Sequence, residues 1–160
     1  MELTLNKTSL DAHRQIYPYS CIPMAVELVL KQIGKLPSDS FLLQEEWKNK
    51  ATGSFGDFDG RTVNGVAFQA KFCLPRNDQF PLKDLFDAIS AELSDGRFVV
   101  ISLEVAGGWH MHVIYGKDSE GDFKAVTKNG CGLTENIESV KRIVTDMKGT
   151  DILVYNPVSN

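Results

Sequence analysis

The sequence lacks the features that define several large classes of protein. It contains only three cysteines, Cys21, Cys73 and Cys131, and no CxxC pair. This small, odd number argues against a disulfide scaffold and against a four-cysteine zinc site. No run of Lys and Arg is present and the formal net charge is -4. We therefore expect no binding to nucleic acid or to an acidic membrane surface.

Long apolar segments are also missing. The most hydrophobic stretch, residues 22–33, is shorter than a membrane span and contains Glu27 and Lys31. The N-terminus has neither the basic start nor the apolar run of a secretory signal. We expect a cytoplasmic protein, or one exported without a classical signal peptide. The 160 residues, of which 42% are hydrophobic, suffice for a single domain spanning 1–160.

Helical periodicity dominates the first half of the chain. The segments with apolar residues at helical spacing are 22–33, from Ser38 or Asp39 to Trp47, and 81–93. Gly34 follows the first of them and predicts its end. Residues 51–62 are rich in turn formers and predict a loop, whereas 63–72 fit either a helix or a strand.

The second half of the chain changes to short β-branched runs separated by turn residues. These runs predict strands at 98–105, 110–115, 123–127 and 151–155. Gly107-Gly108 joins the first two as a hairpin, and Lys128-Asn129-Gly130 predicts another turn. Helices followed by an antiparallel sheet predict an α+β fold.

Cys21 lies where a loop becomes the apolar helix predicted over 22–33. The thiolate is the reactive form of cysteine, and a helix N-terminus stabilises negative charge. Pro23 fits the first helical turn, where its missing N–H costs nothing. Cys21 is therefore a candidate nucleophile, although free cysteines also commonly pack as small core residues.

A thiol nucleophile needs a base, and the base needs a group that orients it. The chain contains three histidines, His13, His110 and His112. The last two alternate on one predicted strand, so their side chains are expected on the same face. His13 falls in a segment without periodicity, which makes the strand the better source of a base. At least one of the strand histidines is expected to be a structural residue.

Together these segments resemble the papain-like cysteine peptidases, and most closely the double-glycine leader peptidases that process bacteriocins. The first block of the resemblance is Gln15 six residues before Cys21, with a Ser-Cys-x-Pro-x-Ala opening of a helix that ends at Gly34. The second block is a Gly-Trp-His sequence ending at His110, which leads a strand that ends at Gly116. The order of elements is similar over most of the chain.

The resemblance implies a papain-like fold in which the nucleophile helix packs on the C-terminal sheet. It implies that Cys21 is the nucleophile, that His110 is the base and that Asn129 orients the imidazole. Gln15 would donate to the oxyanion together with the Cys21 N–H. The spacing favours His110 over His112. This chain has Ile22 where the family usually has glycine, and Asn129 lies in a different local sequence, so the activity could be altered or lost.

The resemblance implies attack on an amide bond of a peptide or protein substrate, with no cofactor or metal. The same triad serves proteolysis, deamidation and acyl transfer, so a glutamine deamidase or toxin-like effector is an alternative. His110 and His112 could instead hold zinc with Cys21 or Cys131. A catalytically silent peptide-binding module is a further alternative. The sequence from Asp57 to Gly60 matches only part of a calcium loop and predicts a turn.

Overall fold

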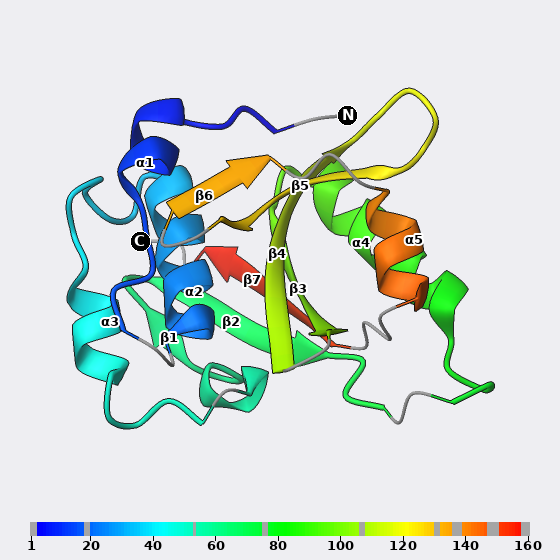
Figure 1. The fold of residues 1–160 in the computed structure, drawn as a ribbon, viewed down its shortest axis with the longest axis horizontal. Helices are drawn as coiled ribbons and strands as arrows, with labels where there is room; N and C mark the ends of the chain where they lie inside the picture. Colours follow the sequence, from blue (N-terminus) through cyan, green and yellow to red (C-terminus); the bar gives the residue numbers. More distant parts are fainter. Residues whose placement is uncertain are drawn as a thin grey trace.

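The protein has an α+β architecture, in which helices cover an antiparallel sheet (Figure 1). The computed structural model describes residues 3–17, 20–52, 54–74, 77–105, 108–129, 132–135, 139–146 and 151–157. The helices are α1 (Lys7–Ala12), α2 (Cys21–Gln32), α3 (Leu42–Trp47), the 3-10 helix η1 (Phe55–Asp57), α4 (Leu82–Ser94) and α5 (Val140–Asp146). The strands are β1 (Thr62–Val63), β2 (Val66–Lys71), β3 (Val99–Val105), β4 (Gly108–Lys117), β5 (Phe123–Asn129), β6 (Gly132–Glu135) and β7 (Ile152–Pro157).

The described strands form one sheet in the order β1-β2-β7-β3-β4-β5-β6, and every neighbouring pair is antiparallel. The last strand, β7, lies between β2 and β3. It therefore joins the hairpin that precedes α4 to the hairpins that follow it.

Two hydrophobic clusters lie on opposite faces of this sheet. Met111, Val113 and Tyr115 of β4 belong to a cluster with the apolar residues of α2. Ile114 belongs to a second cluster, with residues of α4 and α5 such as Leu85. Because successive side chains of a strand point to opposite faces, the first cluster defines an α2 face and the second an α4 face.

Helix α2 confirms the predicted helix and its predicted end. Its central residues are buried on all sides, so it is a core helix rather than a surface helix. Gly34 adopts a φ of +77°. Its N–H donates to the Lys31 carbonyl, and the Lys35 N–H donates to the Leu30 carbonyl. These two bonds form a Schellman motif, for which glycine is the favoured residue.

The predicted helix at 81–93 and the four predicted strands are also present, as α4, β3, β4, β5 and β7. The helix predicted from residue 38 or 39 is shorter and begins at Leu42. The turn predicted at Asp57–Gly60 is confirmed, because η1 ends at Asp57 and the Arg61 N–H donates to the Phe58 carbonyl across the turn that follows. The ambiguous residues 63–72 contain the β1–β2 turn and β2.

The turn predicted at 128–130 is wrong for Lys128 and Asn129, which continue strand β5 and pair with β6. Cross-strand pairing with β6 extends β5 beyond its apolar residues. Gly107 and Gly130 lie outside the described residues. The described elements that the sequence did not predict are α1, η1, β1, β6 and α5.

Candidate functional site

Cys21 is the first residue of α2 and is half-buried against the cluster of the α2 face. The preceding Ser20 makes no side-chain cap bond to the helix. Ile22 is 1% exposed and packs in the core. Ile22, which stands where the peptidases that the sequence resembles usually have glycine, therefore anchors the helix and does not line the surface beside the sulfur.

Gln15 lies in the loop between α1 and α2 and is half-buried. Its Nε2 donates to the Tyr17 carbonyl oxygen at 2.8 Å. The Ser20 hydroxyl also donates to the Tyr17 carbonyl, at 2.9 Å. The loop thus closes on itself just before Cys21, although Pro18 and Tyr19 lie outside the described residues.

A buried amide from α3 holds the same loop at three points. Gln44 is 0% exposed. Its Oε1 accepts from the Ile16 N–H at 2.8 Å and lies 2.9 Å from the Ser20 hydroxyl, which shares its one proton between this oxygen and the Tyr17 carbonyl. Its Nε2 donates to the Arg14 carbonyl and to Glu27 Oε1, both at 2.9 Å. Because the backbone N–H can only donate and the backbone carbonyl can only accept, these partners fix the orientation of the amide.

Glu27, in the middle of α2, completes this network. Its second oxygen, Oε2, accepts from the Leu43 N–H at 3.0 Å. Burial raises the pKa of Glu27, and the bonds from Gln44 and Leu43 and the charge of Lys31 oppose that effect. Sequence reasoning missed this network. Its visible signal was the pair Glu27 and Lys31, two charges in an otherwise apolar helix.

His13 belongs to the same buried region and cannot act as a base for Cys21. Its Nε2 lies 2.8 Å from the Met24 carbonyl oxygen, and its Nδ1 lies 2.9 Å from Lys31 Nζ. A carbonyl must accept, so Nε2 carries the proton and Nδ1 accepts from Lys31. Burial, aided by the charge of Lys31, lowers the pKa of His13 to about 4, although the bond to Met24 opposes the shift. Both ring nitrogens are therefore occupied.

Strand β4 carries the other two histidines. His112 is 7% exposed and pairs with Ile101 of β3 and with Thr127 of β5. Ile101 belongs to the cluster of the α4 face. Cross-strand partners share a face, so His112 points away from α2 and is not a partner for Cys21. The backbone of His110 pairs with Leu103, and its side chain lies outside the described residues.

The N-terminal segment ties the end of α2 to the end of β4. The Asn6 N–H donates to Gln32 Oε1, in the last turn of α2, at 2.7 Å. The Leu3 N–H donates to the Tyr115 carbonyl, near the end of β4, at 2.8 Å. Leu3 and Asn6 are only three residues apart in the chain. The two elements therefore finish near each other, and they run in the same direction in Figure 1.

Their starts lie at similar levels, because the two elements run in the same direction over similar lengths. Cys21 is about 16 Å along α2 from its last residue, at 1.5 Å per residue. His110 is about 17 Å along β4 from residue 115, at 3.4 Å per residue. Cys21 and the backbone of His110 thus lie at similar levels. Strand β5 runs back toward this end, since its Thr127 pairs with His112 and Asn129 follows two residues later. The side chain of Asn129 lies outside the described residues.

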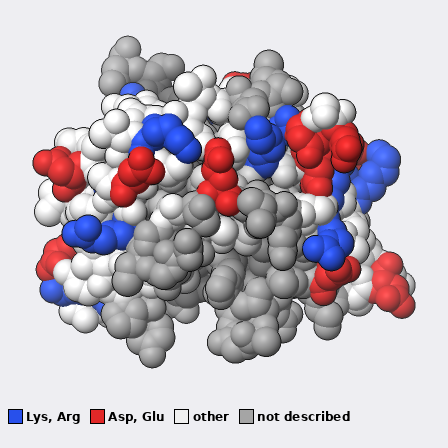
Figure 2. Space-filling view, turned by 45° about the horizontal axis from the view of Figure 1, so that its top comes forward, with Lys and Arg blue, Asp and Glu red and all other residues white. Residues whose placement is uncertain are grey.

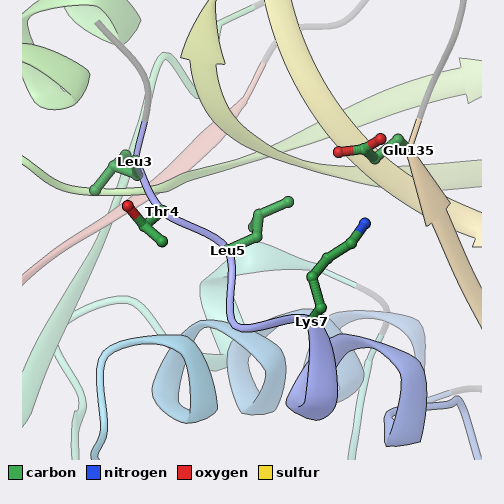
Figure 3. A pocket seen from close by; sticks show the side chains of 5 residues that line it. All are labelled: Leu3, Thr4, Leu5, Lys7 and Glu135. Atoms are coloured by element: carbon green, nitrogen blue, oxygen red, sulfur yellow. The ribbon is translucent and has the colours of Figure 1, made fainter.

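A pocket of about 430 Å³ lies at the opposite end of α2, between the N-terminal segment and β6. Figure 3 shows Lys7 and Glu135 extending into the same space, beside Leu3, Thr4 and Leu5. The Tyr115 hydroxyl donates to Glu135 Oε1 at 3.0 Å. This pocket adjoins the anchored ends of α2 and β4, so it is separate from the Cys21 site.

Neither the charges on the described surface nor similarity to known proteins indicates a particular reaction. On the face shown in Figure 2, the described acidic and basic side chains are interspersed. Among the described residues, no helix is long and apolar enough to cross a membrane. No group of three or more His, Cys, Asp and Glu able to hold a metal occurs in the described part of the chain. No protein-family model matches the sequence, and neither does any curated protein.

Proposed function

We propose that the protein is a thiol-dependent hydrolase of amide bonds with a papain-like fold and site. Cys21 is the nucleophile, His110 is the base, Asn129 orients the imidazole and Gln15 helps to bind the oxyanion. One observation carries the proposal: Cys21 begins a buried helix, beside an anchored loop that holds Gln15, at the level where strand β4 reaches residue 110.

The first half of the reaction forms an acyl-enzyme. His110 takes the proton of the Cys21 thiol, and the thiolate attacks the amide carbonyl carbon. The carbonyl electron pair moves to oxygen, where the Gln15 amide and the Cys21 N–H stabilise it. When the oxyanion collapses, the C–N bond breaks and His110 gives its proton to the leaving amine.

The second half releases the product. His110 takes a proton from water as the water attacks the thioester, and the C–S bond then breaks to give a carboxylate and the Cys21 thiolate. The leaving amine is a peptide fragment in proteolysis and ammonia in glutamine deamidation. Both substrates fit the same chemistry.

The proposed role of His110 requires a particular orientation of its side chain at the start of β4. Regular alternation from His112 would direct position 110 toward the α4 face. The β3–β4 pairing is regular as far as Val105 and Gly108, so the imidazole of His110 must reach Cys21 around the end of the sheet rather than by a change of face. The two histidines are thus expected to behave differently when each is replaced.

Alkylation with iodoacetamide at pH 7, followed by mapping of the modified cysteine, tests the proposal. We expect fast labelling of Cys21 that is lost in His110→Ala, retained in His112→Ala and insensitive to a chelator. Labelling lost only in His112→Ala would move the base to His112. Labelling that becomes faster when a chelator is added would favour zinc. Slow labelling in the unaltered protein would leave only a silent binding module.

Product analysis then separates the two reactions. With a peptide that contains glutamine, ammonia release without chain cleavage identifies a deamidase. New peptide termini identify a peptidase. Cys21→Ala is the matched control for both, since it removes the nucleophile and keeps a small side chain at the start of α2.

A further inference from the structure

The buried amide of Gln44 contacts the loop on both sides of Gln15 and immediately before Cys21. Its partners there are Arg14, Ile16 and Ser20. We propose that Gln44 is a positioning residue, which sets the distance between the Gln15 amide and the Cys21 N–H and so assembles the oxyanion hole. This inference rests on the proposed function and extends it to a residue outside the triad.

The geometry of this network favours Gln44 over the other contacts of the loop. The other link from α3 joins the Tyr17 hydroxyl to Glu45 at the surface. Exposed polar contacts of this kind contribute little, because water competes for both partners. Gln44 is fully buried, and all four hydrogen-bonding positions of its amide are used. Glu27, itself buried in α2, holds the amide in place.

Positioning matters here because oxyanion donors act through fixed distances. A donor helps only when it meets the oxygen as negative charge develops, and removal of one donor typically slows a reaction about 100-fold or more. Simple alkylation of a thiolate forms no oxyanion. A reagent that forms an oxyanion and one that does not therefore separate the arrangement of the hole from the reactivity of Cys21.

The two probes are N-acetylglycylglycinal and iodoacetamide. With the aldehyde, the S–C bond forms as the carbonyl pair moves to oxygen, and protonation of that oxygen gives a reversible hemithioacetal. Its affinity is measured as protection of Cys21 from alkylation. Gln44→Glu is the main variant, because it keeps the two acceptor contacts of the side chain but sets a second carboxylate against Glu27.

The paired change Glu27→Gln with Gln44→Glu is the rescue. It keeps the net charge, restores an amide-to-carboxylate bond between positions 27 and 44, and retains an acceptor for Leu43, but it does not restore the donor to the Arg14 carbonyl. Glu46→Gln is the matched control on the same helix, since Glu46 is exposed and pairs only with Lys50 in the described structure. Ser20→Ala removes one bond to Gln44 together with the bond of the hydroxyl to the Tyr17 carbonyl, and it provides a smaller change if Gln44→Glu does not fold.

We expect Gln44→Glu to weaken aldehyde protection at least about tenfold, whereas the alkylation rate of Cys21 changes by less than about threefold. The paired change should restore part of the protection, Ser20→Ala should weaken it partly, and Glu46→Gln should leave it unchanged. Protection that survives in Gln44→Glu and Ser20→Ala, or protection and alkylation that fall together, would overturn the inference.

The two probes applied to the unaltered protein separate a failure of the oxyanion hole from a failure of the proposed function. Selective alkylation of Cys21 without any protection by the aldehyde would overturn the oxyanion hole and the role of Gln44, but would leave the reactive thiolate. Absence of selective alkylation would overturn the proposed function itself.

Discussion

The two faces of the sheet are built in different ways. The cluster of the α4 face is assembled from apolar side chains of α4, α5 and the sheet. On the α2 face, the helices and their flanking residues also bury six polar or charged side chains next to the apolar core: Ser9, His13, Ser20, Glu27, Lys31 and Gln44. Burial of polar groups costs free energy unless each is hydrogen-bonded, so apolar packing would have been the simpler solution there.

This difference indicates which face of the sheet does more than stabilise the fold. Apart from the buried His112, the described core side chains of the α4 face are apolar and exclude water from the sheet. The polar groups of the α2 face form directional contacts, and these end at the loop between Arg14 and Ser20 rather than at the core. We infer that the α4 face contributes stability alone, whereas the α2 face also fixes the loop beside Cys21.

The largest effect should come from one truncation on each face. Glu27→Ala removes the acceptor of Gln44 and Leu43, and Leu85→Ala opens a cavity under α4. Each should lower the free energy of unfolding by about 3 kcal/mol, measured by urea denaturation. Only Glu27→Ala should also weaken aldehyde protection of Cys21 under conditions where both variants are folded. An equal change in Leu85→Ala would abolish the distinction between the faces.

The second effect is a dependence on pH that belongs to the α2 face. His13 has its pKa lowered from 6.5 to about 4 by burial. Between these values the unfolded chain binds a proton that folded His13 does not, so the free energy of unfolding should rise with pH across this window. The full rise is about 3 kcal/mol, at 1.36 kcal/mol per pKa unit.

Denaturation at several pH values, in parallel with His13→Gln, isolates this contribution. The glutamine can donate to the Met24 carbonyl and accept from Lys31, but it does not titrate. The difference between the two proteins should vary from pH 4 to 6.5 and be flat above pH 7. A constant difference would show that folded His13 is protonated as readily as in the unfolded chain.

The smallest effect should be the same on both faces. Helices α2 and α4 both end in a Schellman motif, at Gly34 with a φ of +77° and at Gly96 with a φ of +82°. A Cβ at either position meets nothing within 4 Å, so only backbone strain opposes it. Gly34→Ala and Gly96→Ala should each lower the midpoint of urea denaturation by an amount equivalent to about 1 kcal/mol. Costs that differ by more than that amount would mean that the two motifs are not equivalent.

Sequence reasoning predicted the elements with a strong pattern. The apolar period of α2, with Gly34 after it, and the β-branched run of β3 specify their own conformation. The sequence Asn64-Gly65 is also typical of a two-residue hairpin turn, and this hairpin was not predicted. Both of its residues have positive φ, which is the requirement of a type I′ hairpin, and they join β1 to β2.

Other features depend on partners that no local pattern reveals. Strand β6 has four residues and exists through its pairing with β5. The roles of Glu27 and Gln44 depend on α3 lying against α2, across 17 residues of sequence. The candidate site is similar in this respect, because Cys21 could be recognised from its own neighbours, whereas the face of His112 required the register of the whole sheet.

The most direct measurement compares two cysteines in the same molecule. Cys73 is an exposed residue. Partial desolvation of its thiol, and then the negative charges of Asp151 and Asp59, raise the pKa of that thiol. Cys21 is half-buried, so access alone favours Cys73. We predict that iodoacetamide at pH 7 modifies Cys21 at least about ten times faster than Cys73 in the folded protein, and that the ratio approaches one in urea. Equal rates, or faster labelling of Cys73 in the folded protein, would contradict the assignment of Cys21 as a nucleophile.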